Sequence, residues 1–172
     1  KSLEFLKLMY RRTSLRVRSN GDLSEEFQQL LGVHQGGPFS PTAFSVYIND
    51  VFDRMRENGL VTSIPMVARK FIGLLFADDM VMMARSRSRA VQLIDELEAW
   101  GTKWGLSFGV KPDGSKCAIV PIGEKQCRRA TTMELRLGGK VIPVVSEYLY
   151  LGIPITSELS VDRMREYALD RG

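Results

Sequence analysis

The stretch Gly73-Leu74-Leu75-Phe76-Ala77-Asp78-Asp79-Met80-Val81-Met82 places two adjacent acidic residues between two apolar runs. This pattern predicts a β-hairpin, with strands at residues 71–76 and 80–84 and an acidic turn. We expect the first strand to be buried. Two carboxylates at its end would then need a partner, because like charges raise each other's pKa and oppose burial. Mg²⁺ is such a partner, since it takes oxygen ligands from carboxylates and phosphates. The alternative is a solvated turn, where Asp is common.

The bulk composition limits the class of protein. The chain has 172 residues, of which 44% are hydrophobic and 26% charged, which fits one compact domain or part of a larger one. The net charge of +4 is a mild bias toward polyanions. Two cysteines and one histidine argue against a Cys/His zinc site and a disulfide-stapled fold, and favour a reducing compartment. No signal peptide or membrane-length apolar run is visible.

The order of the predicted elements indicates an α+β fold with antiparallel strands and helices on one side. Helices are predicted at residues 2–12, from Pro41 to about residue 58, at 88–104 with a stop at Gly105, and at 157–170. A hairpin is predicted over residues 14–28, turning at Asn20-Gly21. Short strands are expected at residues 116–121, 134–137, 140–145 and 147–151. No repeat or long linker interrupts this order.

The segment Gly32-Val33-His34-Gln35-Gly36-Gly37-Pro38-Phe39-Ser40-Pro41 predicts a loop that leads into a helix. Ser40 can cap that helix, and Pro41 suits its first position. The glycines allow a close approach of the backbone to a bulky ligand, and a helix N-terminus favours phosphate. Gln35 can donate and accept at a base or sugar edge. The alternative is a plain helix-entry loop, and we interpret His34 as an exposed loop residue.

Both segments resemble one family. Phe76-Ala77-Asp78-Asp79 resembles the aromatic-x-Asp-Asp signature of reverse transcriptases, in the version found in non-LTR (LINE-like) retrotransposons. The loop at 32–41 resembles the same family's Gly-Val-x-Gln-Gly-x-Pro-x-Ser-Pro element, and the match continues through Tyr47-Ile48-Asn49-Asp50. The resemblance implies a polymerase palm-like antiparallel sheet packed on helices. An unrelated α+β domain would leave two long motifs in the correct order as a coincidence.

The resemblance also implies roles for individual residues. Asp78 and Asp79 would bind Mg²⁺ (or Mn²⁺) and take part in two-metal transfer of nucleotides from dNTPs to a primer 3′-end. Gln35 and Gly36, together with Phe76 and Ala77, would face the nucleotide and the template. The implied partners are an RNA template, a DNA primer and dNTPs, with no membrane, and the implied location is the nucleus or cytoplasm.

Two later segments extend the resemblance. Trp104-Gly105-Leu106 to Lys116-Cys117 resembles the family's Gly-Leu-x-x-Asn…Lys-Cys stretch, which implies a catalytic role for Lys116. Gly109 and Val110 stand where the family has Asn, so the register between Lys111 and Lys116 is open, and a solvated lysine is the alternative. Tyr148-Leu149-Tyr150-Leu151-Gly152 resembles the Tyr-Leu-Gly hairpin that grips the primer. The alternative there is a buried strand that ends in a turn.

One expected carboxylate is not found. The family carries another essential Asp on a strand upstream of the glycine-rich loop, whereas residues 1–31 offer only Asp22, beside the Asn20-Gly21 turn. We expect that strand, and the fingers, to precede Lys1, and the thumb to follow Gly172. Residues 1–172 would then be a partial reverse transcriptase domain that is inactive by itself. The alternative is a non-catalytic module derived from a reverse transcriptase that binds nucleic acid or protein.

Overall fold

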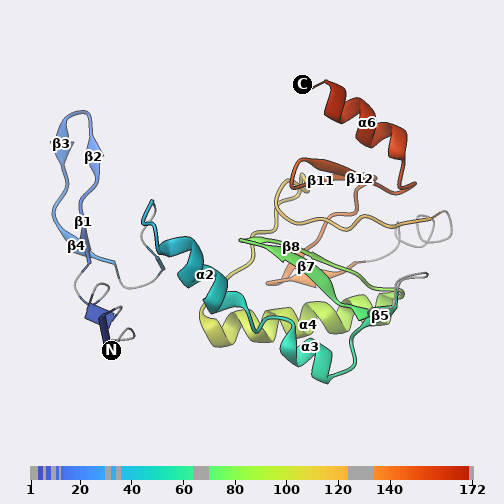
Figure 1. Cartoon of the computed structure of the whole chain (residues 1–172), viewed down its shortest axis with the longest axis horizontal. Helices are drawn as coiled ribbons and strands as arrows, with labels where there is room; N and C mark the ends of the chain where they lie inside the picture. Colours follow the sequence, from blue (N-terminus) through green and yellow to red (C-terminus); the bar gives the residue numbers. More distant parts are fainter. Residues whose placement is uncertain are drawn as a thin grey trace. The chain divides into compact units, whose positions relative to one another are not determined.

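A computed structural model describes residues 4–5, 7–8, 11, 13–29, 32–33, 36–63, 70–123 and 134–170 (Figure 1). The chain divides into two compact units, Lys1–Tyr47 and Ile48–Gly172. Each unit is described by itself below. The second unit contains the acidic turn and the tyrosine-rich hairpin, and the first contains the glycine-rich loop.

The first unit contains the predicted hairpin. Strand β1 (Ser14–Leu15) pairs with β4 (Phe27–Gln28), and β2 (Arg18–Ser19) pairs with β3 (Asp22–Leu23), all antiparallel. Asn20 and Gly21 both have positive φ, 52° and 95°, as a type I′ hairpin turn requires. The prediction for residues 14–28 is therefore confirmed. Of the helix predicted at 2–12, Glu4, Phe5, Lys7 and Leu8 are helical, and most of the remainder lies outside the described residues.

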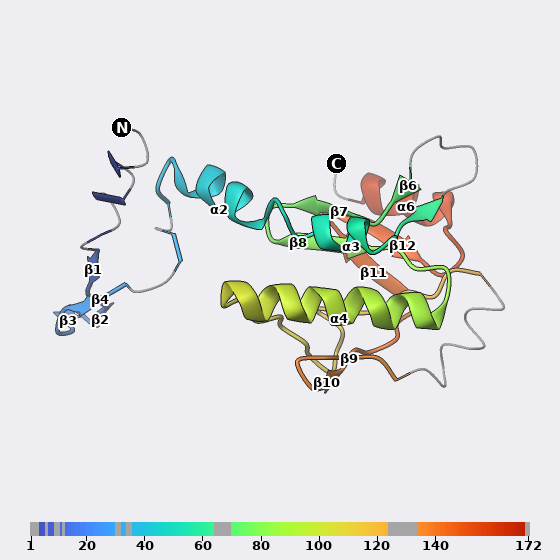
Figure 2. The same cartoon turned by 90° about the horizontal axis from the view of Figure 1, so that it is seen from below.

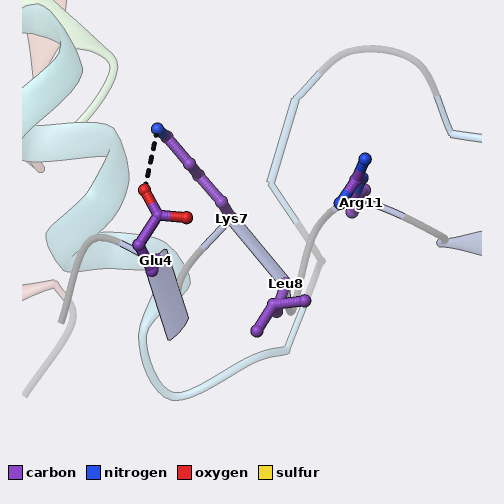
Figure 3. A pocket seen from close by; sticks show the side chains of 4 residues that line it. All are labelled: Glu4, Lys7, Leu8 and Arg11. Atoms are coloured by element: carbon purple, nitrogen blue, oxygen red, sulfur yellow. Dashed lines mark hydrogen bonds and ion pairs between the residues drawn. The ribbon is translucent and has the colours of Figure 1, made fainter. Parts of the chain in front are cut away.

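A pocket of about 450 Å³ lies at the start of this unit (Figure 3). Its lining residues are Glu4, Lys7, Leu8 and Arg11. The Lys7 ammonium donates to the Glu4 carboxylate at 3.2 Å, between side chains that are 62% and 72% exposed. An exposed pair of this kind contributes little stability. The lining offers no group of residues that would indicate a reaction.

The helix expected from Pro41 to residue 58 is two helices. Helix α2 spans Ser40–Ile48 and α3 spans Asp53–Glu57, so the single-helix prediction is wrong. Between them Val51 N–H donates to the Ile48 carbonyl and Asp53 N–H to the Asp50 carbonyl, which is the tighter i→i−3 pattern. Asp50, which lies in this tighter segment, accepts a hydrogen bond from the Trp100 indole at 2.9 Å. Ser40, expected as the cap, is the first residue of α2.

The hairpin around the acidic turn is present. Strand β7 (Gly73–Phe76) pairs antiparallel with β8 (Asp79–Met82), with Gly73 opposite Met82 and Phe76 opposite Asp79. Phe71 belongs instead to β6 (Lys70–Phe71), which pairs with β5 (Thr62–Ser63). The expectation of a buried first strand is wrong. The side chains of Leu74 and Phe76 are 51% and 65% exposed, because they share the strand face that points away from the core.

Helix α4 (Arg87–Trp104) organises the core of the second unit, where it packs against α3 and strand β9 (Figure 2). Ser86 caps its start by accepting from Arg89 N–H, and Gly105 ends it at φ 68°, as predicted. Periodicity places Leu93, Leu97, Trp100 and Trp104 on one apolar face; the first three are buried, whereas Trp104 is 36% exposed. Other buried apolar residues of this unit are Ile48, Val51, Met55, Leu60, Ile72, Ile94, Val110, Leu135, Leu137 and Ile142.

The end of the chain forms two hairpins and a helix. Strand β9 (Arg136–Leu137) pairs with β10 (Lys140–Val141), and β11 (Glu147–Tyr150) with β12 (Ile153–Thr156). The stretch expected as a strand at 116–121 contributes a single bridge between Ile119 and Val144. Helix α6, expected at residues 157–170, spans Val161–Leu169 and is capped by Ser160. Val161 is 61% exposed, and α6 buries no residue.

The α+β class is thus confirmed, and the described strands pair two by two in antiparallel fashion. The continuous palm-like sheet stays a prediction. In the described part of the chain, no helix has both the length and the apolar character that crossing a bilayer requires.

Candidate functional site

The acidic turn is a tight connection between β7 and β8. Ala77 and Asp78 form the two-residue loop, and Asp79 is the first residue of β8. Ala77 adopts a φ of 50°, a left-handed conformation that is unfavourable for a residue with a Cβ. Both carboxylates are exposed, so burial does not by itself demand a cation here. The turn instead presents two adjacent carboxylates to solvent, where an incoming ligand can reach them.

Two tyrosines of β11 lie within electrostatic range of this turn. Tyr148 and Tyr150 are two residues apart and therefore point to the same face of the strand. Burial raises the pKa of both phenols, and the charge of Asp79 raises both further. For Tyr148 the neighbouring Cys117 thiol contributes as well. The predicted metal ligand Asp79 and the predicted primer hairpin therefore lie within electrostatic range of each other.

The backbone of Lys116 contacts one of these tyrosines. The Tyr148 hydroxyl donates to the Lys116 carbonyl oxygen at 3.4 Å. The exposed Lys116 side chain runs past Gly109, where an added Cβ would lie 3.8 Å from the Lys116 Cβ. Lys111 is exposed, and its charge helps to lower the pKa of the Asp113 carboxyl, behind the hydrogen bonds from Ser115. Of the two lysines, Lys116 is the one joined directly to the tyrosine strand.

The tyrosine-rich segment is a hairpin, as the sequence predicted. Leu151 and Gly152 form its turn with φ values of 50° and 79°. Leu149 in strand β11 is 46% exposed, so the alternative of a buried strand is wrong for this side chain. Two nitrogens of the Arg163 guanidinium on α6 contact the two carboxylate oxygens of Glu147, at 3.1 and 3.4 Å. This fork attaches α6 to the first residue of β11.

The glycine-rich loop lies in the first unit. Gly36 is exposed and has a φ of 78°, which favours glycine. The Ser40 N–H donates to the Gly37 carbonyl at 3.0 Å, which leads the loop into α2. Gln35 and His34 lie outside the described residues. The roles of Gln35 and Gly36 toward a template therefore stay predictions.

Sequence reasoning missed two polar contacts that shape the second unit. The Trp100 indole N–H donates to the Asp50 carboxylate at 2.9 Å across fifty residues of sequence. The Glu147–Arg163 fork is the other, across sixteen residues. Asp50 was visible only as part of a motif, and no local pattern marks the partner of either carboxylate.

The donor set near the acidic turn is small. Within the described ranges, no group of three or more His, Cys, Asp or Glu side chains is arranged to hold a metal ion. Asp78 and Asp79 alone still fit a Mg²⁺ ion, because Mg²⁺ keeps several waters and takes one or two carboxylates plus substrate oxygens. The free thiol of Cys117 is a poor ligand for such a hard cation, and burial raises its pKa.

Comparisons with known proteins agree with the motifs. The family model "Reverse transcriptase (RNA-dependent DNA polymerase)" matches residues 1–155. The chain is 29% identical over 160 residues to the "Retrovirus-related Pol polyprotein from type-1 retrotransposable element R2" of Nasonia vitripennis, covering 89% of this chain and 15% of that protein. It is 26% identical over 140 residues to the "RNA-directed DNA polymerase from mobile element jockey" of Drosophila funebris, covering 77% and 14%. The chain thus spans about 15% of the length of these relatives. By the extent of the family match, it belongs to the reverse transcriptase family.

Proposed function

We propose that residues 1–172 are the palm portion of an RNA-directed DNA polymerase of the non-LTR retrotransposon type. It would add dNTPs to a primer 3′-end on an RNA template. The observation that supports this proposal is a link between three separately predicted motifs. Asp79 lies within electrostatic range of Tyr148 and Tyr150, and the Tyr148 hydroxyl donates to the backbone carbonyl of Lys116. A chance resemblance gives no reason for these segments to be neighbours.

In this proposal each group has a physical task. Asp78 and Asp79 hold Mg²⁺ or Mn²⁺, which when bound neutralises charge that develops on the transferring phosphoryl group. Phe76 and Ala77 approach the nascent base pair from the exposed side of the hairpin, and Gln35 and Gly36 contact nucleotide and template. The hairpin from Tyr148 to Gly152 supports the primer. Lys116 supplies a positive charge for the leaving pyrophosphate.

The test is primer extension on an RNA template with a longer protein that contains this chain in its natural context. We expect Asp78→Asn and Asp79→Asn each to lower kcat at least a hundredfold, because each removes a charged metal ligand. Asp113→Asn is the matched control. Asp113 is an exposed Asp that accepts hydrogen bonds from Ser115 in a local turn, and its loss should leave the rate within about twofold. Full activity in the Asp78 and Asp79 variants would contradict the proposal.

The isolated chain is expected to be inactive. Two-metal transfer needs carboxylates around ions about 3.5–4 Å apart. Asp78 and Asp79 provide two, and the described residues bring no third acidic or histidine side chain to them. Primer extension by the 172-residue chain with Mg²⁺ or Mn²⁺ should therefore give no product. Incorporation that Asp78→Ala abolishes would overturn this expectation and show that another carboxylate completes the site.

The same small donor set favours a second candidate, a non-catalytic binding module. Such a module would bind RNA or protein equally well with and without Mg²⁺. In the longer protein it would also bind RNA without extending any primer.

A further inference from the structure

The hydroxyl of Tyr150 is an unusual polar group. Its oxygen is shielded from solvent, and no described residue forms a hydrogen bond with it. Tyr148 points to the same face of β11, yet its hydroxyl has an acceptor in the Lys116 carbonyl. Buried polar atoms are nearly always paired, and each exception in a native structure calls for an explanation.

Asp79 is the charged group that acts on this hydroxyl. Burial raises the pKa of Tyr150 most, and the negative charge of Asp79 raises it further. The carboxylate therefore lies within electrostatic range of the hydroxyl. Asp79 itself is exposed and forms no hydrogen bond or ion pair with another described residue. It is therefore free to turn about its side-chain bonds. A donor without an acceptor thus lies within electrostatic range of an acceptor without a donor.

We propose that the Tyr150 hydroxyl is a positioning group for Asp79, to which it donates a hydrogen bond when the carboxylate binds a divalent cation. This inference rests on the proposed function, because it requires that Asp79 is a metal ligand. Tyr150 does not touch the cation. It holds the second oxygen of the carboxylate, so that the first is aimed at the ion.

The chemistry favours this arrangement. Carboxylates that bind metals are themselves hydrogen-bonded, and these outer partners fix the orientation of the ligand. A hydroxyl shielded from water has no competing solvent partner, which strengthens a bond to a charged acceptor. The Tyr150 oxygen is shielded from solvent, whereas the Asp79 side chain is exposed. The shielded hydroxyl can therefore orient the exposed carboxylate.

The experiment measures Mn²⁺ binding by the whole 172-residue chain, followed by the loss of the free-ion electron paramagnetic resonance signal. Tyr150→Phe removes the hydroxyl and keeps the ring. We expect it to weaken Mn²⁺ binding about three- to tenfold. Tyr167→Phe makes the same chemical change on α6 and should leave the affinity unchanged. In the metal-free chain, Tyr150→Phe should unfold at the same temperature as the parent or a higher one, because the lost hydroxyl was unpaired.

A merely structural role for Tyr150 predicts the opposite pattern. The hydroxyl would then stabilise the metal-free chain and leave Mn²⁺ affinity unaltered, and either result would overturn the proposal. The effect must also act through Asp79. Tyr150→Phe should weaken binding to the same degree in an Asp78→Asn background, and by less than twofold in an Asp79→Asn background.

A measurement on the chain without any tyrosine substitution covers the case in which Tyr150→Phe fails to fold. Tb³⁺ is a hard cation whose emission is sensitised by a nearby phenol, so we expect tyrosine-excited emission that Asp79→Asn removes. No such emission, or emission indifferent to Asp79→Asn, would overturn the proposal. That outcome is separate from a failure of the proposed function, which the longer protein tests through DNA synthesis with Asp79→Asn.

Discussion

Gly73 begins β7 at a point where the two backbones of the hairpin approach closely. A Cβ added at Gly73 would lie 2.1 Å from the Val81 carbonyl oxygen and 3.1 Å from the Phe52 ring. The first contact is with backbone and cannot be relieved by a rotamer change. We predict that Gly73→Ala lowers the free energy of unfolding by about 3 kcal/mol, measured by urea denaturation.

Gly105→Ala is the control for this substitution. Gly105 has a φ of 68° and open space around it, so only the left-handed backbone opposes a Cβ. Gly105→Ala should lower the free energy of unfolding by about 1 kcal/mol. An equal or smaller effect for Gly73→Ala would show that the hairpin can open without penalty.

The residue types of the candidate site could be read from sequence, but not their surroundings. Asp78 and Asp79 are recognisable because a charged pair between apolar runs is a local pattern. That Phe76 is 65% exposed could not be read from the same run, because alternate residues of a strand face opposite sides. The unpaired hydroxyl of Tyr150 depends on atoms contributed by distant segments, for which no local signal exists.

At the scale of elements, the turn of the β11–β12 hairpin has an unfavourable first residue. Leu151 has a φ of 50°, where Asn is much better tolerated in a type I′ turn. Leu151→Asn should therefore raise the free energy of unfolding by about 0.5–1 kcal/mol, seen as a higher midpoint in thermal unfolding. Little burial is lost, since the side chain is 45% exposed.

Leu149→Asn provides the comparison for the turn substitution. Leu149 is 46% exposed but lies within strand β11, where Asn is disfavoured. It should lower the unfolding midpoint. A higher unfolding midpoint in both variants would mean that the removal of an exposed leucine, and not the turn geometry, stabilises the protein.

Hairpins were the elements best predicted from sequence, because their turns are specified by two adjacent residues. Asn20-Gly21 is the clearest case. The break between α2 and α3 could not be predicted, since apolar periodicity continues through it to Met55. Asp50 lies within this break, and its partner Trp100 lies on another helix, a contact that no local pattern marks.

At the scale of the whole second unit, one hydrogen bond joins the segment between α2 and α3 to α4. Trp100→Phe removes the indole donor and leaves the part-buried Asp50 carboxylate without its 2.9 Å partner. We predict a loss of about 2–3 kcal/mol in the free energy of unfolding, followed by circular dichroism in urea. The 36% exposed Trp104, changed to Phe, should cost less than about 1 kcal/mol.

A second pair of variants tests whether an acceptor oxygen at position 50 is needed for this contact. Asp50→Asn keeps an acceptor oxygen and should destabilise less than Asp50→Ala. Equal losses for these two variants would argue that the Trp100 bond contributes nothing.

The class of fold was predictable because the element types are local. The pairing of strands two by two was not, because long-range pairing depends on packing.

The fork between Arg163 and Glu147 links α6 to the strand that carries the two tyrosines. The helix buries none of its own residues, yet two contacts fasten it to the first residue of the strand that carries Tyr148 and Tyr150. The helix also lies against β12, so it adjoins both strands of the hairpin. A partner that binds α6 would therefore lie beside the strand whose tyrosines are within electrostatic range of Asp79.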